Sequence, residues 1–284
     1  MPSAVEKSSL ADRVRAATDK GLVSLPPLPE AAMRIEALLR DEEKADSRQI
    51  AALIEKEPAL AAAMLRLANS ATFGGLHAVV DPADAVSRLG LKQVRTLVTT
   101  VAHHGHYDCQ DPRCLTLQRK LWDHAVAAAV LCRHIARLVA AEPAEAFLAG
   151  LLHDVGKLVV LKAIPVVEGG QHPITCTEPV LLELMDVMHA ELGHQVLTQW
   201  HISGGVAEAA LKHHSEEAVD GRSLTGIVEA ANTITRQMGH HLHPTPELVL
   251  IEMPEIERLG LSELELASML VDAEDEIDEV LRSF

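Results

Sequence analysis

The stretch Gly150-Leu151-Leu152-His153-Asp154-Val155-Gly156-Lys157 places an imidazole next to a carboxylate inside an otherwise apolar run. Burying an ionised carboxylate is unfavourable unless a counter-charge, a hydrogen-bond donor or a metal ion satisfies it. On a helix, adjacent side chains point about 100° apart, so His153 and Asp154 can reach one ion only near a helix end or at the rim of a cleft. The stretch therefore predicts a polar or metal-binding site within a helical core.

Further histidines on predicted helices are candidate metal ligands, namely His124, His189, His213 and His214. Ala127 and Ala128 lie about one turn after His124, and Gly193 lies one turn after His189, so we expect open space beside both rings. An ion or a substrate is expected to use that space.

Two of the candidate residues leave alternatives open. His213 and His214 point about 100° apart on their helix, so one is expected to bind the ion and the other to lie behind it or in solvent. Lys157 either neutralises a bound anion such as phosphate or pairs with Asp154. Gly156 is expected to let another segment approach closely.

The ligand types indicate the kind of ion and its chemistry. Imidazole and carboxylate ligands together suit a borderline divalent ion such as Fe, Mn, Zn or Ni. Such an ion lowers the pKa of a bound water and generates a nucleophile for phosphoester attack. If the site is active, Asp154 and Lys157 are the candidate catalytic residues. A surface or capping role is expected for the remaining dense clusters, His103, His104, His106, His240, His241 and His243.

Composition excludes several classes of partner. The chain has 25 Lys and Arg against 41 Asp and Glu, a formal net charge of −16, which repels nucleic-acid phosphates and anionic membranes. Aromatic residues make up 2%, which leaves few platforms for stacking single-stranded bases. No apolar run reaches the roughly 18 residues of a membrane span. We therefore expect neither a nucleic-acid partner nor a membrane anchor.

The cysteines and the first residues indicate the compartment. Cys109, Cys114, Cys132 and Cys176 are scattered and form no CxxC pair, which is typical of reduced thiols rather than a disulfide framework. Residues 1–20 carry several charges and no apolar h-region, so no signal peptide is expected. Both features favour a cytoplasmic protein.

Most of the chain is predicted to be helical, because Ala, Leu, Glu and Arg dominate and apolar residues recur at spacings of three and four. A long amphipathic helix is expected over 117–141, and Pro143 begins the next one, which carries the His153-Asp154 pair. Glycine and proline predict a loop over 165–179. The expected fold class is all-α.

Helix start signals mark several boundaries. Ser47 is predicted to cap a helix over 48–56, and Ser262-Glu263-Leu264-Glu265 resembles a capping box at the start of a terminal helix. Further helices are expected over 180–200, 206–217 and 224–238. The Gly-, Asp- and Pro-containing segment 105–113 is the expected internal boundary.

The order of these motifs resembles a known family. His124 followed by the Gly150–Lys157 stretch is similar to the HD superfamily of metal-dependent phosphohydrolases, and other segments narrow the resemblance to the HDOD (HD-related output domain) family. Leu25-Pro26-Pro27-Leu28-Pro29 looks like its entry motif, and Glu57–Leu60 with Leu65–Ala71 looks like its most specific signature. The resemblance extends to further matching segments over 85–90, 189–193, 200 and 213–214.

The resemblance implies an all-helical, two-lobed fold in which an N-terminal helical lobe packs on an HD-like helical lobe. It also implies bacterial signal transduction, often without demonstrated catalysis. With the helix predictions, it divides the chain into an N-terminal helix, an N-terminal lobe, an HD-like lobe and a C-terminal helical extension, over residues 1–21, 22–113, 114–243 and 244–284.

The chain departs from the catalytic pattern at one implied ligand. In catalytic HD enzymes a later aspartate commonly completes the metal site, and the matching residue here is Asn232, a weaker and neutral ligand. Related cyclic-di-GMP phosphodiesterases carry a Gly-Tyr-Pro element after their paired histidines, whereas this chain has Asp220-Gly221-Arg222-Ser223 there. That specific activity is therefore not expected. The implied metal ligands are His124, His153, Asp154, His189, His213, His214 and Asn232.

Three functions follow from these features. The first is a signalling module without efficient catalysis that binds a protein partner such as a kinase or response regulator. The second is a divalent-metal phosphohydrolase acting on a nucleotide or another phosphoester. The third is a sensor that binds a nucleotide ligand without cleaving it. The sequence leaves the oligomeric state open.

Overall fold

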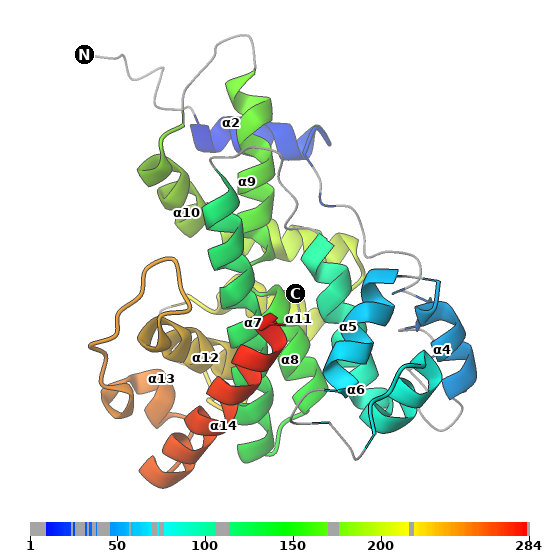
Figure 1. The fold of residues 1–284 in the computed structure, drawn as a ribbon. Coiled ribbons are helices and arrows are strands. Elements are labelled where there is room, and N and C mark those ends of the chain that lie inside the picture. The colour runs from blue at the N-terminus through cyan, green and yellow to red at the C-terminus, as the bar shows by residue number, and fades with distance from the viewer. Residues whose placement is uncertain are drawn as a thin grey trace, which may run out of the picture.

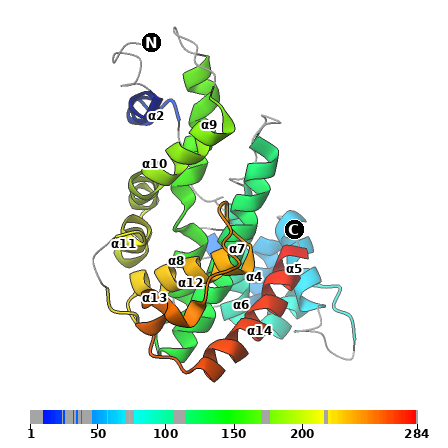
Figure 2. The ribbon, with the colours of Figure 1, turned by 90° about the vertical axis from the view of Figure 1, so that its left-hand side faces the viewer.

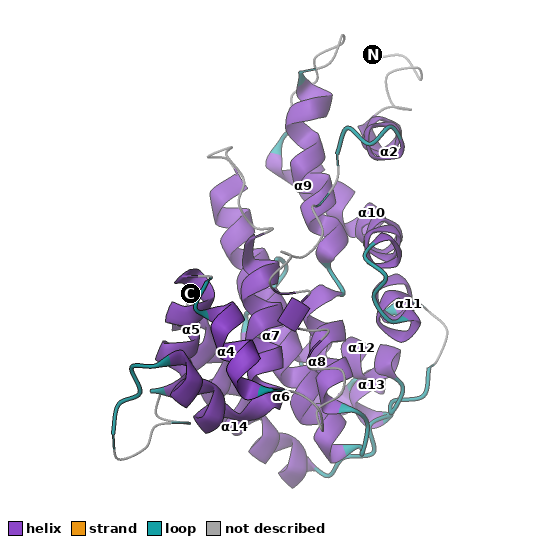
Figure 3. Cartoon of the chain, turned by 90° about the vertical axis from the view of Figure 1, so that its right-hand side faces the viewer, coloured by secondary structure: helices purple, strands orange, loops and turns teal. Residues whose placement is uncertain are grey.

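The computed structural model describes residues 10–23, 46–56, 58–69, 77–105, 114–169, 176–215 and 219–282, with Leu25, Ala32, Arg34, Ile35, Leu38 and Phe73 singly between them. These residues form helices and loops and contain no strand, which confirms the predicted all-α class (Figure 3). No helix among them is long and apolar enough to cross a membrane. The Pro26–Pro29 part of the entry motif, Ser70-Ala71 and His106–Arg113 lie outside the described residues.

The helices follow one another along the chain with short connections (Figure 1). Their bounds are α2 Leu10–Asp19, α4 Ser47–Ile54, α5 Pro58–Ala68, α6 Pro82–His104, α7 Leu115–Leu138, α8 Pro143–Leu152, α9 Val155–Glu168, α10 Glu178–Gln199, α11 Gly204–Lys212, α12 Leu224–Met238, the 3₁₀-helix η3 Leu250–Glu252, α13 Pro254–Glu257 and α14 Glu263–Arg282.

The buried apolar residues form two separate clusters. The smaller cluster joins α4, α5 and α6 around fully buried residues such as Ile50, Ile54 and Met64. The cap of α4 is Asp46, whose carboxylate accepts a hydrogen bond from the Arg48 N–H at 2.9 Å, rather than the predicted Ser47, which is the first helical residue. The two clusters agree with a two-lobed architecture.

The larger cluster is built around α7, which is buried along most of its length. Helices α8 and α12 pack on α7, and α14 packs on it from another side (Figure 2). Val14 of the N-terminal helix α2 and Ile277 of α14 belong to this core, because α2 lies across α9 and α14 lies along α7. Both chain ends therefore pack on the lobe that carries the His-Asp pair.

Helix α8 ends at Leu152 and α9 begins at Val155, so the His-Asp pair lies between two helices rather than within one as predicted. His153 closes the end of α8, and Asp154 precedes the first turn of α9. This is the helix-end position from which adjacent side chains can reach one point. The break therefore allows both groups to serve a single site.

Two glycines permit the helix contacts that surround this junction. A Cβ on Gly150 would lie 2.6 Å from the Ala128 carbonyl oxygen of α7. A Cβ on Gly156 would lie 2.0 Å from the His189 carbonyl oxygen of α10. Only glycine allows these backbones to approach so closely, which confirms the expectation for Gly156.

The predicted loop over 165–179 is too long. Helix α9 continues through Pro165 to Glu168, and α10 already begins at Glu178. Ile164 and Val167 keep the buried face of α9 in the core on both sides of the proline, so apolar burial outweighs the lost N–H donor. Residues 170–175 lie outside the described part. Helix α11 also ends earlier than predicted, at Lys212.

The last helix, α14, is held by a capping box and by a buried ion pair. Glu265 accepts hydrogen bonds from the Ser262 N–H and hydroxyl at 2.9 and 2.7 Å, as the sequence predicted. Glu276 accepts hydrogen bonds from Arg133 and, at 2.8 Å, from His134, both on α7. Burial alone would raise the pKa of Glu276, but these two donors outweigh it and lower the pKa.

The close contact at Gly156 predicts a strong effect of one methyl group. Gly156→Ala is expected to lower the free energy of unfolding by about 1–3 kcal/mol, because the obstructing atoms are backbone and cannot rotate away. Gly204→Ala in α11 is the control, since nothing lies within 4 Å of its Cβ, and it is expected to change stability by less than about 1 kcal/mol. Urea denaturation measures both; equal effects would contradict the contact.

The ion pair under α14 predicts a second difference in stability. Glu276→Gln is expected to cost about 3 kcal/mol, because it leaves the buried Arg133 without its counter-charge. Asp278→Asn removes an exposed pair with Arg282 on the same helix and is expected to cost less than about 0.5 kcal/mol. Thermal and urea unfolding of the two variants would show whether the cost depends on burial, as this interpretation requires.

Candidate metal centre

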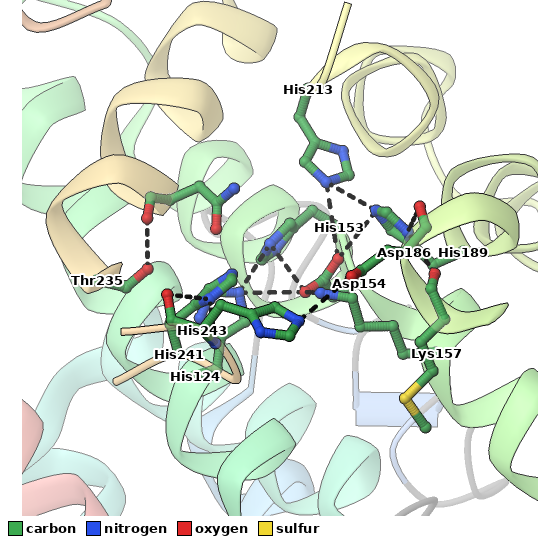
Figure 4. A network of polar contacts seen from close by, with 12 residues as sticks. His124, His153, Asp154, Lys157, Asp186, His189, His213, Thr235, His241 and His243 are labelled. Atoms are coloured by element: carbon green, nitrogen blue, oxygen red, sulfur yellow. Dashed lines mark hydrogen bonds and ion pairs between the residues drawn. The ribbon is translucent and has the colours of Figure 1, made fainter. Parts of the chain in front are cut away.

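Five predicted ligands meet at the junction of five helices (Figure 4). They are His124 in the middle of α7, His153 at the end of α8, Asp154 at the start of α9, His189 on α10 and His213 at the end of α11. All five are buried, and none is more than 7% exposed. Segments that span 90 residues of sequence therefore place their polar side chains at one point inside the apolar core.

One group of ligand atoms gathers on the Oδ2 atom of Asp154. His124 Nε2 lies 3.2 Å and His153 Nε2 lies 3.5 Å from this oxygen. The two imidazole nitrogens lie 3.1 Å from each other. Three ligand atoms from three helices are thus mutually adjacent and form a group able to hold a metal ion.

A second group gathers on the other carboxylate oxygen. His189 Nε2 lies 3.4 Å and His213 Nε2 lies 3.6 Å from Asp154 Oδ1, and the two nitrogens are 3.3 Å apart. The neighbouring His214 completes a group of three imidazoles. Asp154 therefore presents one oxygen to each group, in the manner of a carboxylate that bridges two ions. The sequence analysis expected one ion and missed this division.

The outer nitrogen of each ring fixes which nitrogen faces inward. The Nδ1–H groups of His124, His153, His189 and His213 donate to backbone carbonyls at 2.7–2.9 Å. A carbonyl oxygen only accepts, so the proton of each neutral ring is on Nδ1 and the Nε2 lone pair points at Asp154. Metal-binding histidines in proteins are commonly held in this way.

Burial keeps the rings neutral and the carboxylate charged. Desolvation lowers the pKa of His153 well below its ordinary value and lowers the pKa of His189 to about 4. Burial alone would raise the pKa of Asp154, but Lys157, His153 and the other surrounding donors outweigh it and hold the pKa well below the ordinary value. Neutral imidazoles around a carboxylate anion are the protonation states that a cation requires of its ligands.

Lys157 pairs with Asp154, which decides between the two predicted roles. Its Nζ atom lies 2.6 Å from Asp154 Oδ2, one turn further along α9, and both side chains are buried. The ammonium group therefore holds the carboxylate in place and balances its charge. The alternative expectation, that Lys157 binds a phosphate, has no support in this geometry.

The spacing of the ligand atoms fits a bound divalent ion. Ligand atoms about 2.0–2.2 Å from a common ion lie roughly 3.0–3.6 Å from one another, which covers the separations in both groups. Asp154 Oδ1 is buried and has no hydrogen-bond partner among the described residues. A buried carboxylate oxygen without a donor calls for a cation.

The two remaining predicted ligands lie at the edge of the centre. His214 is exposed, and its ring centroid lies 5.1 Å from that of His189. Asn232 on α12 is buried, and its Oδ1 atom has no hydrogen-bond partner. Both residues line a hollow of about 490 Å³ that also reaches His213. The centre is therefore accessible from one side.

The histidines after α12 were predicted to lie at the surface, and this was wrong for part of the segment. The His240 carbonyl accepts the hydrogen bond from His124 Nδ1, and the half-buried His241 ring stacks edge-on against His124 at 4.9 Å. His243 pairs with Asp186 of α10 at 3.2 Å and ties the segment across the centre (Figure 4). His103 is also buried rather than exposed. The clustering of histidines was the available signal.

The small residues beside His124 and His189 do not leave the expected open space. Ala128 and Gly150 are in backbone contact, which brings α8 onto α7. Gly193 lies against Gly156, with a Cβ position 3.3 Å from the Gly156 nitrogen. The space is therefore filled by neighbouring helices, and the ligand-accessible side is the hollow beside α12.

Comparison with known proteins identifies the family. The model of the HDOD domain matches residues 25–216. The chain belongs to the HDOD family. An uncharacterised HDOD-like relative of Treponema pallidum is 26% identical over 227 residues, which are 76% of this chain and 42% of that protein. The chain thus spans less than half the length of this curated relative.

Solved structures share the HDOD fold over nearly the whole chain. One is a Shewanella amazonensis protein called a "putative metal-dependent phosphohydrolase", with a TM-score of 0.71 and 23% identity over 96% of this chain and 97% of that one. Another is a Marinobacter aquaeolei protein called a "putative signal transduction protein", with a TM-score of 0.62 and 20% identity over 97% of this chain and 65% of that one. These similarities confirm the architecture.

The two groups of ligands predict that one histidine of α10 is needed for metal and another is not. His189→Ala is expected to remove most of the bound metal, because it takes a ligand from the group on Asp154 Oδ1. His194→Ala, on the same helix, is the control and should keep the metal, because His194 belongs to neither group. Plasma mass spectrometry of tag-free protein measures both; equal metal contents would rule out the assigned ligand.

Proposed function

We propose that this HDOD protein is a signal-transduction module that holds a divalent metal at Asp154 and binds a phosphate-bearing small molecule in the adjoining hollow, with little or no turnover. The bound state would be passed to a signalling protein partner. The observation that carries the proposal is the convergence of four imidazole nitrogens, each fixed through its Nδ1–H, on the two oxygens of one buried carboxylate.

The side chains of the centre would divide the work of binding. His124, His153, His189, His213 and Asp154 would hold Fe, Mn, Zn or Ni, and Lys157 orients the carboxylate. A divalent ion of this class, when bound, supplies positive charge that attracts a phosphate oxygen and activates water. Arginines in the wall of the hollow, described below, add the positive charge that an anionic ligand needs.

Asn232 is the reason to expect little turnover. Its amide carries no charge, so the centre has one anionic group fewer than the pattern of the catalytic HD enzymes implies. An amide also cannot take a proton from an attacking water. The buried position of Asn232 beside His213 in the hollow supports a ligand-binding role for this residue rather than a surface one.

A metal-dependent phosphohydrolase is the second candidate. The retention of five converging ligands favours it, since a purely structural core has no need for four inward-facing lone pairs around a carboxylate. In that case Asp154 and its ligand group would be needed for hydrolysis of a phosphoester. The two candidates share the metal centre and differ in turnover.

Metal content and phosphoester hydrolysis of three proteins test this proposal. The tag-free parent, after incubation with Fe, Mn, Zn or Ni, is expected to hold near-stoichiometric metal and to hydrolyse no member of a nucleotide and bis(p-nitrophenyl) phosphate panel. His153→Ala is expected to lose the metal. Asn232→Asp restores a carboxylate and is expected to hold metal at least as tightly as the parent.

The outcomes separate the candidates. Metal-dependent turnover by the parent that disappears in His153→Ala would establish the phosphohydrolase. Metal without turnover in the parent, and turnover only in Asn232→Asp, would support the binding module most directly. Absence of metal from the parent under all conditions would overturn both and leave the His-Asp pair as a structural feature of the core.

A further inference from the structure

The hollow beside the metal centre is lined by a polar stripe of α12. Glu229, Asn232, Thr233 and Arg236 recur at spacings of three and four residues and all face this hollow. Residues seven apart on a helix are separated by about 10 Å along its axis. Arg258 and Glu255, from the α13 region, form the opposing wall. The stripe is therefore longer than a phosphate group alone needs.

Buried polar atoms without partners concentrate on these walls. Glu229 Oε1, Asn232 Oδ1, Arg236 Nε and Arg258 Nε are buried and have no hydrogen-bond partner among the described residues. Glu229 and Asn232 are 9% and 7% exposed. An unpaired buried donor or acceptor is unfavourable, so such a group calls for a missing partner.

The partly used side chains define what that partner must offer. Arg258 donates from Nη2 to Glu229 Oε2 at 2.8 Å, which orients both groups and leaves Arg258 Nε and Glu229 Oε1 available. Arg236 donates to Thr245 at 3.2 Å and keeps Nε available. Two acceptors and two donors side by side suit a flat ring edge that carries both donors and acceptors.

We propose that Glu229 and Arg258 are specificity-determining residues that bind the base of a nucleoside monophosphate whose phosphate lies toward His213 and the metal centre. The proposal rests on the proposed function, since the phosphate end depends on the metal. The base would satisfy Glu229 Oε1 and Arg258 Nε, while Pro254 in the same wall offers an apolar surface to its ring.

Equilibrium binding to the metal-loaded full-length protein tests the proposal. Isothermal titration would compare AMP, GMP, CMP and UMP with ribose 5-phosphate, phenyl phosphate and inorganic phosphate. At least one nucleotide is expected to bind tenfold or more tightly than ribose 5-phosphate and phenyl phosphate, which corresponds to about 1.4 kcal/mol. Glu229→Gln is expected to reduce that ratio to near one and to leave phenyl phosphate binding unchanged.

A matched variant and a second substitution keep the test independent of folding. Glu257→Gln changes an exposed residue of α13 that lies outside the hollow and is expected to keep the parent ratio. If Glu229→Gln fails to fold, Arg258→Lys keeps a positive charge beside Glu229 but removes the Nε–H donor, and it should also lower the ratio. Circular dichroism and thermal melting establish the fold of each variant.

Each result has a defined meaning. Equal binding of the nucleotides, ribose 5-phosphate and phenyl phosphate would overturn this inference and leave the proposed function standing, with water satisfying the four atoms. A nucleotide preference that survives both Glu229→Gln and Arg258→Lys would also overturn it. If no phosphate compound binds the metal-loaded protein, the proposed function fails together with the inference.

Discussion

The buried carboxylate of Asp154 is the constraint on which the second lobe depends. An ionised carboxylate inside an apolar core is stable only if charges and dipoles surround it. Lys157 provides the charge at 2.6 Å, and four imidazoles complete the surroundings. Since these groups come from α7, α8, α9, α10 and α11, satisfying one carboxylate requires all five helices to meet at one junction.

Glycine makes that meeting possible. Gly150 lets α8 contact the backbone of α7, and Gly156 lets α9 contact the backbone of α10. The same contacts place His124 beside His153, and His189 beside the start of α9. Helix packing and ligand placement are therefore one geometric problem here, because a side chain at either glycine would separate both the helices and the ligands that they carry.

Two environments meet at the metal centre, and their difference gives the site a direction. Toward α7, α8, α9 and α10 the ligands are enclosed by the apolar core, which keeps the imidazoles neutral and their lone pairs directed inward. Toward α12 and α13 the walls are polar and leave donors and acceptors unpaired. A ligand can therefore approach only from a side that is itself built to form hydrogen bonds.

The sequence alone determined the helical class, the family resemblance and the five central ligands, because helical periodicity and the His-Asp motif are local and chemically specific. Tertiary structure decided the rest. The division of the ligands between the two oxygens of Asp154, the His240 carbonyl that orients His124, and the polar stripe opposite Arg258 all depend on contacts between segments distant in sequence. Pro165 and His241 were misjudged for the same reason: a local rule predicts a loop or a surface, and burial against a neighbouring helix overrides it.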